Sequence, residues 1–361
     1  MINQDYDYVK RRWREWWKRE NEDRPLVSVV APKNGKIFPE KYENDVAGRW
    51  QDIEYVVERE KFYCENTYYG GESFPMFNPN LGPDIYGAIL GDCDIEFAEQ
   101  TSWSKHLEKP ELEDCPPFAF DENNRWWKKI KAMTEYAVEK ADGGFLVGVT
   151  DLHTGLDAIT SLYGPERVCT AMYDCPEKLK ELLASSEKVA ERIFSELFAV
   201  TRRRQEGTMN WSQIWDPDGN YYIASCDFAC LISENAFSEY IEPTTQREIE
   251  MLDSSIFHLD GTGALRHLDK LLKMEKLGGV QWVYGEGQPT ARAWRNVVEK
   301  IQNAGKNLQI NVMPEEIEEV CSFVKPEGAH FCIWTPDEDA AKSVLKRVEK
   351  CYLKGVCSVG L

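Results

Sequence analysis

The sequence predicts an α/β protein, a (β/α)₈ TIM barrel with an N-terminal helical and loop extension. Short apolar runs alternate with longer segments of helical periodicity, and the last four apolar runs recur about every 20 to 30 residues. This recurrence is typical of repeated βα units, which form a parallel sheet. The chain contains no glycine-rich dinucleotide fingerprint, so closure into a barrel is favoured over an open, doubly wound sheet.

The predicted elements follow in chain order. Tryptophans at helical spacing predict an amphipathic helix within 11–22, and LVSVVA at 26–31 predicts a buried first strand. Further strands are predicted at 74–77, 145–150, 209–215, 255–260, 280–285, 308–312 and 329–334. Helices are predicted at 176–198, 265–276, 291–305, 314–324 and 337–353. We expect 1–361 to form a single domain, in which 1–72 supply the extension, the first strand and an insertion over one barrel face.

The amino-acid composition argues against nucleic acid and membranes as binding partners. The 361 residues include 62 acidic and 43 basic side chains, a net charge of -19, and such a field repels nucleic acid. No apolar run reaches the roughly 20 residues that cross a bilayer, and the N-terminus lacks a signal-peptide pattern, so we expect a cytoplasmic protein without a membrane partner. The 11 cysteines include no CxxC pair, which disfavours a disulfide framework. A homodimer is compatible with the sequence.

Polar side chains gather at the ends of the later predicted strands. In SIFHLDG the period of two places His258 and Asp260 on one side at the strand exit, Glu286 follows the next strand, and Cys332 lies on the last one. The carboxyl ends of barrel strands build the active site, and zinc accepts imidazole, carboxylate and thiolate ligands. We therefore predict a metal site of these four residues. The alternative is a hydrogen-bonded core histidine, a buried thiol and two carboxylates that anchor loops.

Earlier segments add candidates for acid/base chemistry and substrate binding. Asp151 and His153 follow the strand predicted at 145–150, with Asp157 beyond them, and Asp227 lies in SCDFACLIS. We predict that they orient substrate or move protons; the alternative is that Asp151 caps the following helix and Asp227 pins a loop. Tryptophan in a barrel usually fills space, but aromatic side chains near strand ends also predict an apolar pocket. The residues predicted to bind substrate are Trp211, Trp215, Tyr222, Trp282 and Trp334.

The run FHLDGTGALRHLDKLLKMEKLGGVQWVYGEGQP, with IQNAGKNLQINV after it and CDFACLISENAFSEYIEP before it, resembles the uroporphyrinogen decarboxylase-like superfamily. The similarity extends from about residue 74 to the end and is closest to the corrinoid-linked methyltransferase branch. In that branch a His-x-Cys pair and a distant Cys bind zinc. His258 matches the histidine, Asp260 stands where the first cysteine would be, and Cys332 matches the last. Glu286 falls where related zinc methyltransferases supply a glutamate.

The resemblance implies a zinc-dependent methyltransferase that moves a methyl group from a small methoxylated or methylamine substrate to a corrinoid carried by a partner protein. The harder oxygen of Asp260 suits Lewis-acid activation of a methyl ether better than thiolate activation. One alternative is a metal-free decarboxylase or lyase in which Asp227 and Asp260 exchange protons, and another is a non-catalytic barrel that binds a small ligand. Heme-pathway decarboxylases carry an arginine-rich N-terminal motif, whereas SFPMFNPNLGPDIYGAILG contains no arginine.

Overall fold

The computed structural model describes residues 5–33 and 35–356 and shows a mixed α/β protein with thirteen described strands. These are β1 (Leu26–Pro32), β2 (Thr67–Gly71), β3 (Met76–Phe77), β4 (Ile95–Phe97), β5 (Ser102–Ser104), β6 (Leu146–Val147), β7 (Thr208–Met209), β8 (Trp215–Asp216), β9 (Tyr221–Ser225), β10 (Ser254–Asp260), β11 (Gly279–Val283), β12 (Asn307–Asn311) and β13 (Ala329–Trp334). Seven of them form the central sheet, in the order β2-β1-β13-β12-β11-β10-β9. All neighbours in this sheet pair in parallel except β1 and β2.

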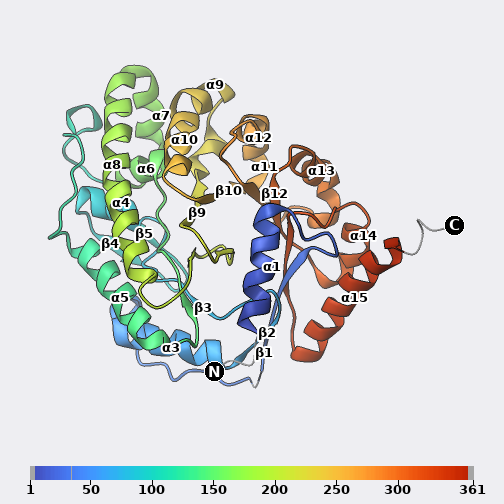
Figure 1. Cartoon of the computed structure of the whole chain (residues 1–361). Helices are drawn as coiled ribbons and strands as arrows, with labels where there is room; N and C mark the ends of the chain where they lie inside the picture. The colour runs from blue at the N-terminus through green and yellow to red at the C-terminus, as the bar shows by residue number, and fades with distance from the viewer. Residues whose placement is uncertain (1–4, 34, 357–361) are drawn as a thin grey trace.

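Helices surround the strands, as Figure 1 shows. The α-helices are α1 (Tyr6–Lys18), α2 (Val46–Gln51), α3 (Ile53–Glu65), α4 (Ile85–Gly91), α5 (Arg125–Ala141), α6 (Gly155–Tyr163), α7 (Pro165–Asp174), α8 (Pro176–Thr201), α9 (Glu234–Ala236), α10 (Glu242–Glu250), α11 (Gly261–Ala264), α12 (Leu268–Leu272), α13 (Arg295–Asn303), α14 (Ile317–Cys321) and α15 (Glu338–Val356). Shorter turns are η1 (Leu112–Asp114), η2 (Asp227–Leu231), η3 (Phe237–Ile241), η4 (Leu265–His267), η5 (Ala291–Trp294) and η6 (Pro314–Glu316). From β9 onward, a helix returns the chain between successive parallel strands, as the repeated βα pattern predicted.

The strand ladder is not closed into a barrel within the described residues. β3 and β6 pair in parallel as a separate two-stranded sheet, and each has only two residues. Beyond this pair, the Val149 amide after β6 donates to the Met209 carbonyl of β7 over 2.9 Å. The structure therefore has a largely parallel seven-strand sheet beside a short parallel pair, in place of the continuous eight-strand ladder predicted.

The strand predicted at 209–215 is wrong, because this segment forms a hairpin. β7 and β8 pair antiparallel, and Gln213 between them adopts a left-handed backbone with φ of 61°, a conformation that a regular strand does not contain. The strand that pairs with β10 is β9, at Tyr221–Ser225, which the sequence analysis did not identify. Residues 32–72, expected to form an insertion, contain α2, α3 and the edge strand β2.

Helix α1 packs against the amino ends of the strands. Its buried residues recur at helical spacing, and the Asp5 carboxylate caps its first turn by accepting a hydrogen bond from the Tyr8 amide. Trp13 packs edge-on against the His330 ring with a centroid distance of 4.9 Å. The same apolar cluster contains the first residues of three strands: Leu26, Leu146 and Tyr221. The amino edge of the strands is therefore filled with apolar and aromatic side chains, which leaves the carboxyl edge for chemistry.

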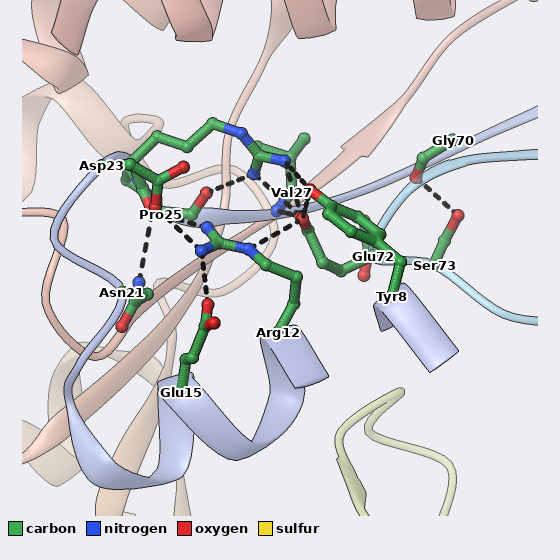
Figure 2. A network of polar contacts seen from close by, with 12 residues as sticks. Tyr8, Arg12, Glu15, Asn21, Asp23, Pro25, Val27, Gly70, Glu72 and Ser73 are labelled. Atoms are coloured by element: carbon green, nitrogen blue, oxygen red, sulfur yellow. Dashed lines mark hydrogen bonds and ion pairs between the residues drawn. The ribbon is translucent and has the colours of Figure 1, made fainter. Parts of the chain in front are cut away.

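A buried ion cluster holds α1 in this position, as Figure 2 shows. The Glu72 side chain is fully buried and accepts hydrogen bonds from Arg24 at 2.7 and 2.9 Å and from Arg12 at 3.3 Å. Glu72 Oε2 also accepts a hydrogen bond from the Val27 amide over 2.8 Å. The backbone carbonyl of Glu72 accepts one from the Trp13 indole nitrogen over 3.1 Å. One carboxylate thus joins α1, the segment before β1, β1 itself and the chain after β2.

We expect Glu72→Gln to destabilise the protein by about 3 to 5 kcal/mol, because the change removes the buried anion that pairs with Arg24 and one of the carboxylates that pair with Arg12. Urea denaturation followed by circular dichroism measures this difference. Asp94→Asn removes an exposed partner of Arg125 and is the matched control, for which we expect an unchanged midpoint. Equal effects of the two substitutions would contradict the assigned role of Glu72.

Two further sequence expectations concern membranes and cysteines. Among the described helices, none combines the length and apolar character required to cross a membrane. The ten cysteines in the described part of the chain are free thiols, consistent with the expected lack of a disulfide framework.

Candidate active site

Histidine and aspartate side chains converge at the carboxyl ends of β6, β9 and β10. His153 follows β6, Asp227 follows β9, and His258 and Asp260 lie at the end of β10. Because parallel strands end at the same edge of a sheet, residues far apart in the chain meet there. Ligand atoms of Asp227, His258 and Asp260 lie within 4.8 Å of one another, as do those of His153, Asp157 and Asp227. Asp227 belongs to both groups.

Carboxylates surround the imidazole of His153. Its Nε2 lies 3.0 Å from Asp151, and its Nδ1 lies 3.5 Å from Asp157 and 3.9 Å from Asp227. Burial alone lowers the pKa of His153, but Asp151 and Asp157 outweigh burial and raise it well above its ordinary value. These carboxylates favour the protonated ring, whose Nε2 faces Asp151 and whose Nδ1 faces Asp157 and the half-exposed Asp227.

Asp157 organises the loop that carries Asp227. Its two oxygens accept hydrogen bonds from the amides of Asp227 and Phe228, over 2.8 and 2.9 Å. Burial raises the pKa of Asp157, but His153 and these amides outweigh burial and lower it. Asp157 lies four residues after His153, within the first turn of α6, so the sequence spacing already placed it near the predicted site residues. The loop is therefore pinned by Asp157, not by Asp227 as the structural alternative supposed, and Asp151 does not occupy the N-cap of α6, which is Thr154.

Asp227 is the most exposed acid of the group, with half of its side-chain surface open to solvent. Partial burial and the nearby charge of Asp157 raise the pKa of Asp227, while His153 and His258 act in the opposite direction. None of the carboxylates of Asp151, Asp157, Asp227 or Asp260 forms an ion pair with a lysine or arginine of the described residues. The cluster therefore carries excess negative charge at an accessible point, which favours a bound cation.

Trp211 links the two histidine groups. Its indole nitrogen donates a hydrogen bond to Asp151 over 2.7 Å, and its ring packs edge-on against His258 with a centroid distance of 5.1 Å. His258 Nδ1 is hydrogen-bonded to the side-chain oxygen of Gln281 on the neighbouring strand. Of the aromatic residues predicted to bind substrate, Trp211 is the one in contact with the histidine and aspartate side chains described above.

Glu286 and Cys332 do not join His258 and Asp260 in either group of ligands found among the described residues. Glu286 lies in an exposed loop beyond β11, so the end of the strand does not direct its side chain. Cys332 lies on β13, which is three strands from β10 in the sheet, and its thiol contacts Gln309 at 3.4 Å. Burial raises the pKa of Cys332 to about 12, so the thiol is protonated in this environment. Among the described residues, the structure therefore groups His258 and Asp260 with Asp227, and it does not group them with Glu286 or Cys332.

Two of the predicted substrate-binding aromatics, Trp215 and Trp282, lie away from the candidate site, and Tyr222 lies behind one of its loops. Trp215 packs with Phe74 and Tyr6 at the amino edge. Tyr222 accepts a hydrogen bond from the Leu152 amide over 2.5 Å, so it braces the loop that carries Asp151 and His153. Trp282 packs against Trp294 on the helical side, because the alternation of a strand places it on the opposite face from Gln281.

Trp334 lines a separate cavity of about 270 Å³ near β1. Its side chain is two-thirds exposed. The remaining lining comes from Ser28, Val30, Glu60, Thr67, Tyr69, Ser73, Phe74, Met76 and Gln213. The cavity combines aromatic walls with a few polar groups, which is the composition of sites for small ligands.

Of three comparisons with known proteins, the comparison of structures is the one that finds a match. No protein-family model matches the chain, and no curated protein matches it. A solved structure of a methyltransferase from Methanosarcina mazei is similar, with a TM-score of 0.61 and 11% sequence identity, over 95% of this chain and 99% of that one. At this level of identity the likeness shows a shared fold.

A buried acid behind the site yields a pH prediction. Glu248 on α10 accepts a hydrogen bond from the Thr154 hydroxyl over 2.6 Å, and burial raises the pKa of Glu248 to about 7. Its contribution to stability is therefore fully present below the unfolded value of about 4.5 and is lost as the pH rises through about 7.

We expect the free energy of unfolding of Glu248→Gln to increase, relative to that of the wild type, by roughly 3 kcal/mol as the pH rises from about 4.5 to about 8.5. The reason is that the amide carries no charge to bury. Urea denaturation across this range measures the difference. The control is Glu250→Gln on the exposed side of the same helix, which we expect to show no such trend. A stability difference for Glu248→Gln that does not vary with pH would refute the assignment.

Proposed function

We propose that this protein is a metal-dependent methyltransferase that moves a methyl group from a small methoxylated or methylamine substrate to a corrinoid carried by a partner protein. The observation that carries the proposal is the grouping of Asp227, His258 and Asp260 at the carboxyl edge of the sheet. The fold likeness to a methyltransferase along almost the whole chain supports the reaction class, and the sequence resemblance supports the corrinoid acceptor.

The donor set fits a divalent cation such as zinc. One imidazole and two carboxylates are ligands that zinc binds in catalytic sites, which keep a further position open for substrate. Asp227 is half exposed, so this edge of the group is accessible from solvent. A metal bound by Asp227, His258 and Asp260 would supply Lewis acidity toward an ether oxygen or amine nitrogen of the substrate.

The remaining residues of the site have separate roles in this proposal. Asp151 and Asp157 raise the pKa of His153, and its ring lies 3.9 Å from Asp227, so in this proposal His153 is a proton donor beside the metal ligands. When the carbon–oxygen or carbon–nitrogen bond breaks, its electron pair stays on the leaving atom, which His153 can protonate. The acceptor supplies the electron pair of the new bond to carbon. Trp211 provides an aromatic wall beside His258, where a planar substrate could pack.

Metal binding and methyl transfer test the proposal together. We expect the wild-type protein to bind zinc at one ion per chain and to methylate a cobalt(I) corrinoid anaerobically with at least one methoxylated or methylamine compound. His258→Ala removes the single nitrogen ligand, so we expect both metal affinity and turnover to fall by more than about 100-fold. Metal analysis of the dialysed proteins and the visible spectrum of the corrinoid provide the two measurements.

His106→Ala is the matched control for this experiment, because His106 is an exposed histidine outside the site. We expect it to match the wild type in both measurements. Equal metal content in wild type and His258→Ala would refute the metal site. A metal that depends on His258, with no methyl transfer from any compound, would leave the site in place and refute the reaction.

A further inference from the structure

A row of polar side chains crosses the interior of the sheet at one height. His258 on β10 is paired in register with Gln281 on β11, Gln281 with Gln309 on β12, and Gln309 with His330 on β13. The side chains are also hydrogen-bonded in this order. The Gln281 nitrogen donates to the Gln309 oxygen over 2.5 Å, and the Gln309 nitrogen contacts His330 Nδ1 at 3.1 Å.

A backbone carbonyl sets the direction of this chain of hydrogen bonds. The Gln309 nitrogen donates to the Ser212 carbonyl over 2.7 Å, and a carbonyl oxygen can only accept. The amide of Gln309 therefore has its nitrogen toward Ser212 and its oxygen toward Gln281. The Gln281 amide is oriented in turn, with its nitrogen toward Gln309 and its oxygen toward His258. Only a protonated Nδ1 of His258 can donate to that oxygen.

Gln309, which links the row to the Ser212 carbonyl, is buried and has fixed neighbours on several sides. Gln309 is 1% exposed. The Ser212 hydroxyl is hydrogen-bonded to Tyr221 at 2.8 Å, which keeps the Ser212 carbonyl in place. His330 is fully buried and accepts at Nδ1, so its Nε2 proton is directed at the Ser28 hydroxyl, 2.8 Å away. Reversing the Gln309 amide would place its oxygen against the Ser212 carbonyl and the His330 lone pair, and both contacts are repulsive.

We propose that Gln281 and Gln309 are positioning residues that hold neutral His258 as its Nδ1–H tautomer, with the Ser212 carbonyl as the fixed end of the row. The lone pair of Nε2 is then the one available to a metal ion beside Asp227 and Asp260. Metal-binding histidines commonly donate their other N–H to a fixed acceptor, which orients the ring and strengthens the ligand. The purpose of the row rests on the metal site proposed above, whereas the tautomer follows from the hydrogen bonds alone.

The tautomer can be read directly from imidazole ¹⁵N chemical shifts in histidine-labelled, metal-free protein. The chain has five histidines, and His258→Ala identifies the signals of His258. At about pH 8, we expect Nδ1 of His258 to show the shift of a protonated nitrogen and Nε2 that of an unprotonated one. A wild-type spectrum with the proton on Nε2 would overturn the proposal without any variant.

Variants of Gln281 separate positioning from packing. Gln281→Leu keeps the size of the side chain but offers no acceptor, so we expect His258 to populate both neutral tautomers. Gln281→Glu keeps an oxygen acceptor for His258 and loses the donor to Gln309, so we expect it to retain the Nδ1–H form. Gln309→Leu removes the link to Ser212, and we expect the same change as in Gln281→Leu but smaller. Gln288→Leu, in an exposed loop, is the control, with no expected change. Identical spectra for Gln281→Leu and the wild type would overturn the proposal.

Zinc affinity supplies a second measurement that does not depend on turnover. We expect the dissociation constant to rise by about 10- to 100-fold in Gln281→Leu and to stay near the wild-type value in Gln281→Glu and Gln288→Leu. Equal losses in Gln281→Leu and Gln281→Glu would indicate a packing effect and overturn the positioning role. If the wild type binds no zinc but shows the Nδ1–H tautomer, the metal proposal fails and the tautomer assignment stands.

Discussion

The parallel register of β10, β11, β12 and β13 is the constraint on which the rest of the structure depends. It brings His258, Gln281, Gln309 and His330 to one height and sets Asp260 at the carboxyl edge. A strand alternates its faces with a period of two, so a slip of one residue would turn Leu259 or Trp282 into the interior and the polar residue outward. The apolar residues between the polar ones thus enforce the arrangement, because they are buried against the helices.

The two ends of the strands carry different kinds of side chain. At the amino edge, α1 brings Trp13 and Trp16 into an apolar cluster, and the Glu72 carboxylate binds the helix to β1 through two arginines. At the carboxyl edge, the carboxylates of Asp151, Asp157, Asp227 and Asp260 lack lysine or arginine partners among the described residues. Packing and ion pairs therefore hold the amino ends of the strands, and the candidate site lies at their carboxyl ends, the usual location in parallel α/β folds.

Secondary structure was predicted best where apolar residues recur with one constant spacing over many residues. The strand at 255–260 and the helix at 176–198 correspond closely to β10 and α8, because alternation and helical spacing act over the whole element. The strand β9 was missed, because the apolar MNWSQIW segment resembles a strand by composition, while the turn at Gln213 depends on contacts across the chain. The closure of the ladder also could not be predicted, since β3 and β6 have too few residues to show a period.

The candidate site was predictable in part for a related reason. His258 and Asp260 lie two residues apart on one strand, so their convergence follows from local geometry. The meeting of Asp227 with them, and the distance of Cys332 from them, depends on the order of strands in the sheet, which the sequence pattern does not specify. Gln281 and Gln309 interrupt apolar strands at matching positions, and this signal becomes interpretable only once the register is known.

The most direct test of the account is a crystal structure of the protein grown with zinc and measured at the zinc absorption edge. We predict an anomalous peak bound by His258 Nε2 together with carboxylate oxygens of Asp227 and Asp260, with Gln281 still hydrogen-bonded to Nδ1. A peak at other residues, or a structure in which these three side chains point away from one another and bind no zinc, would contradict the account.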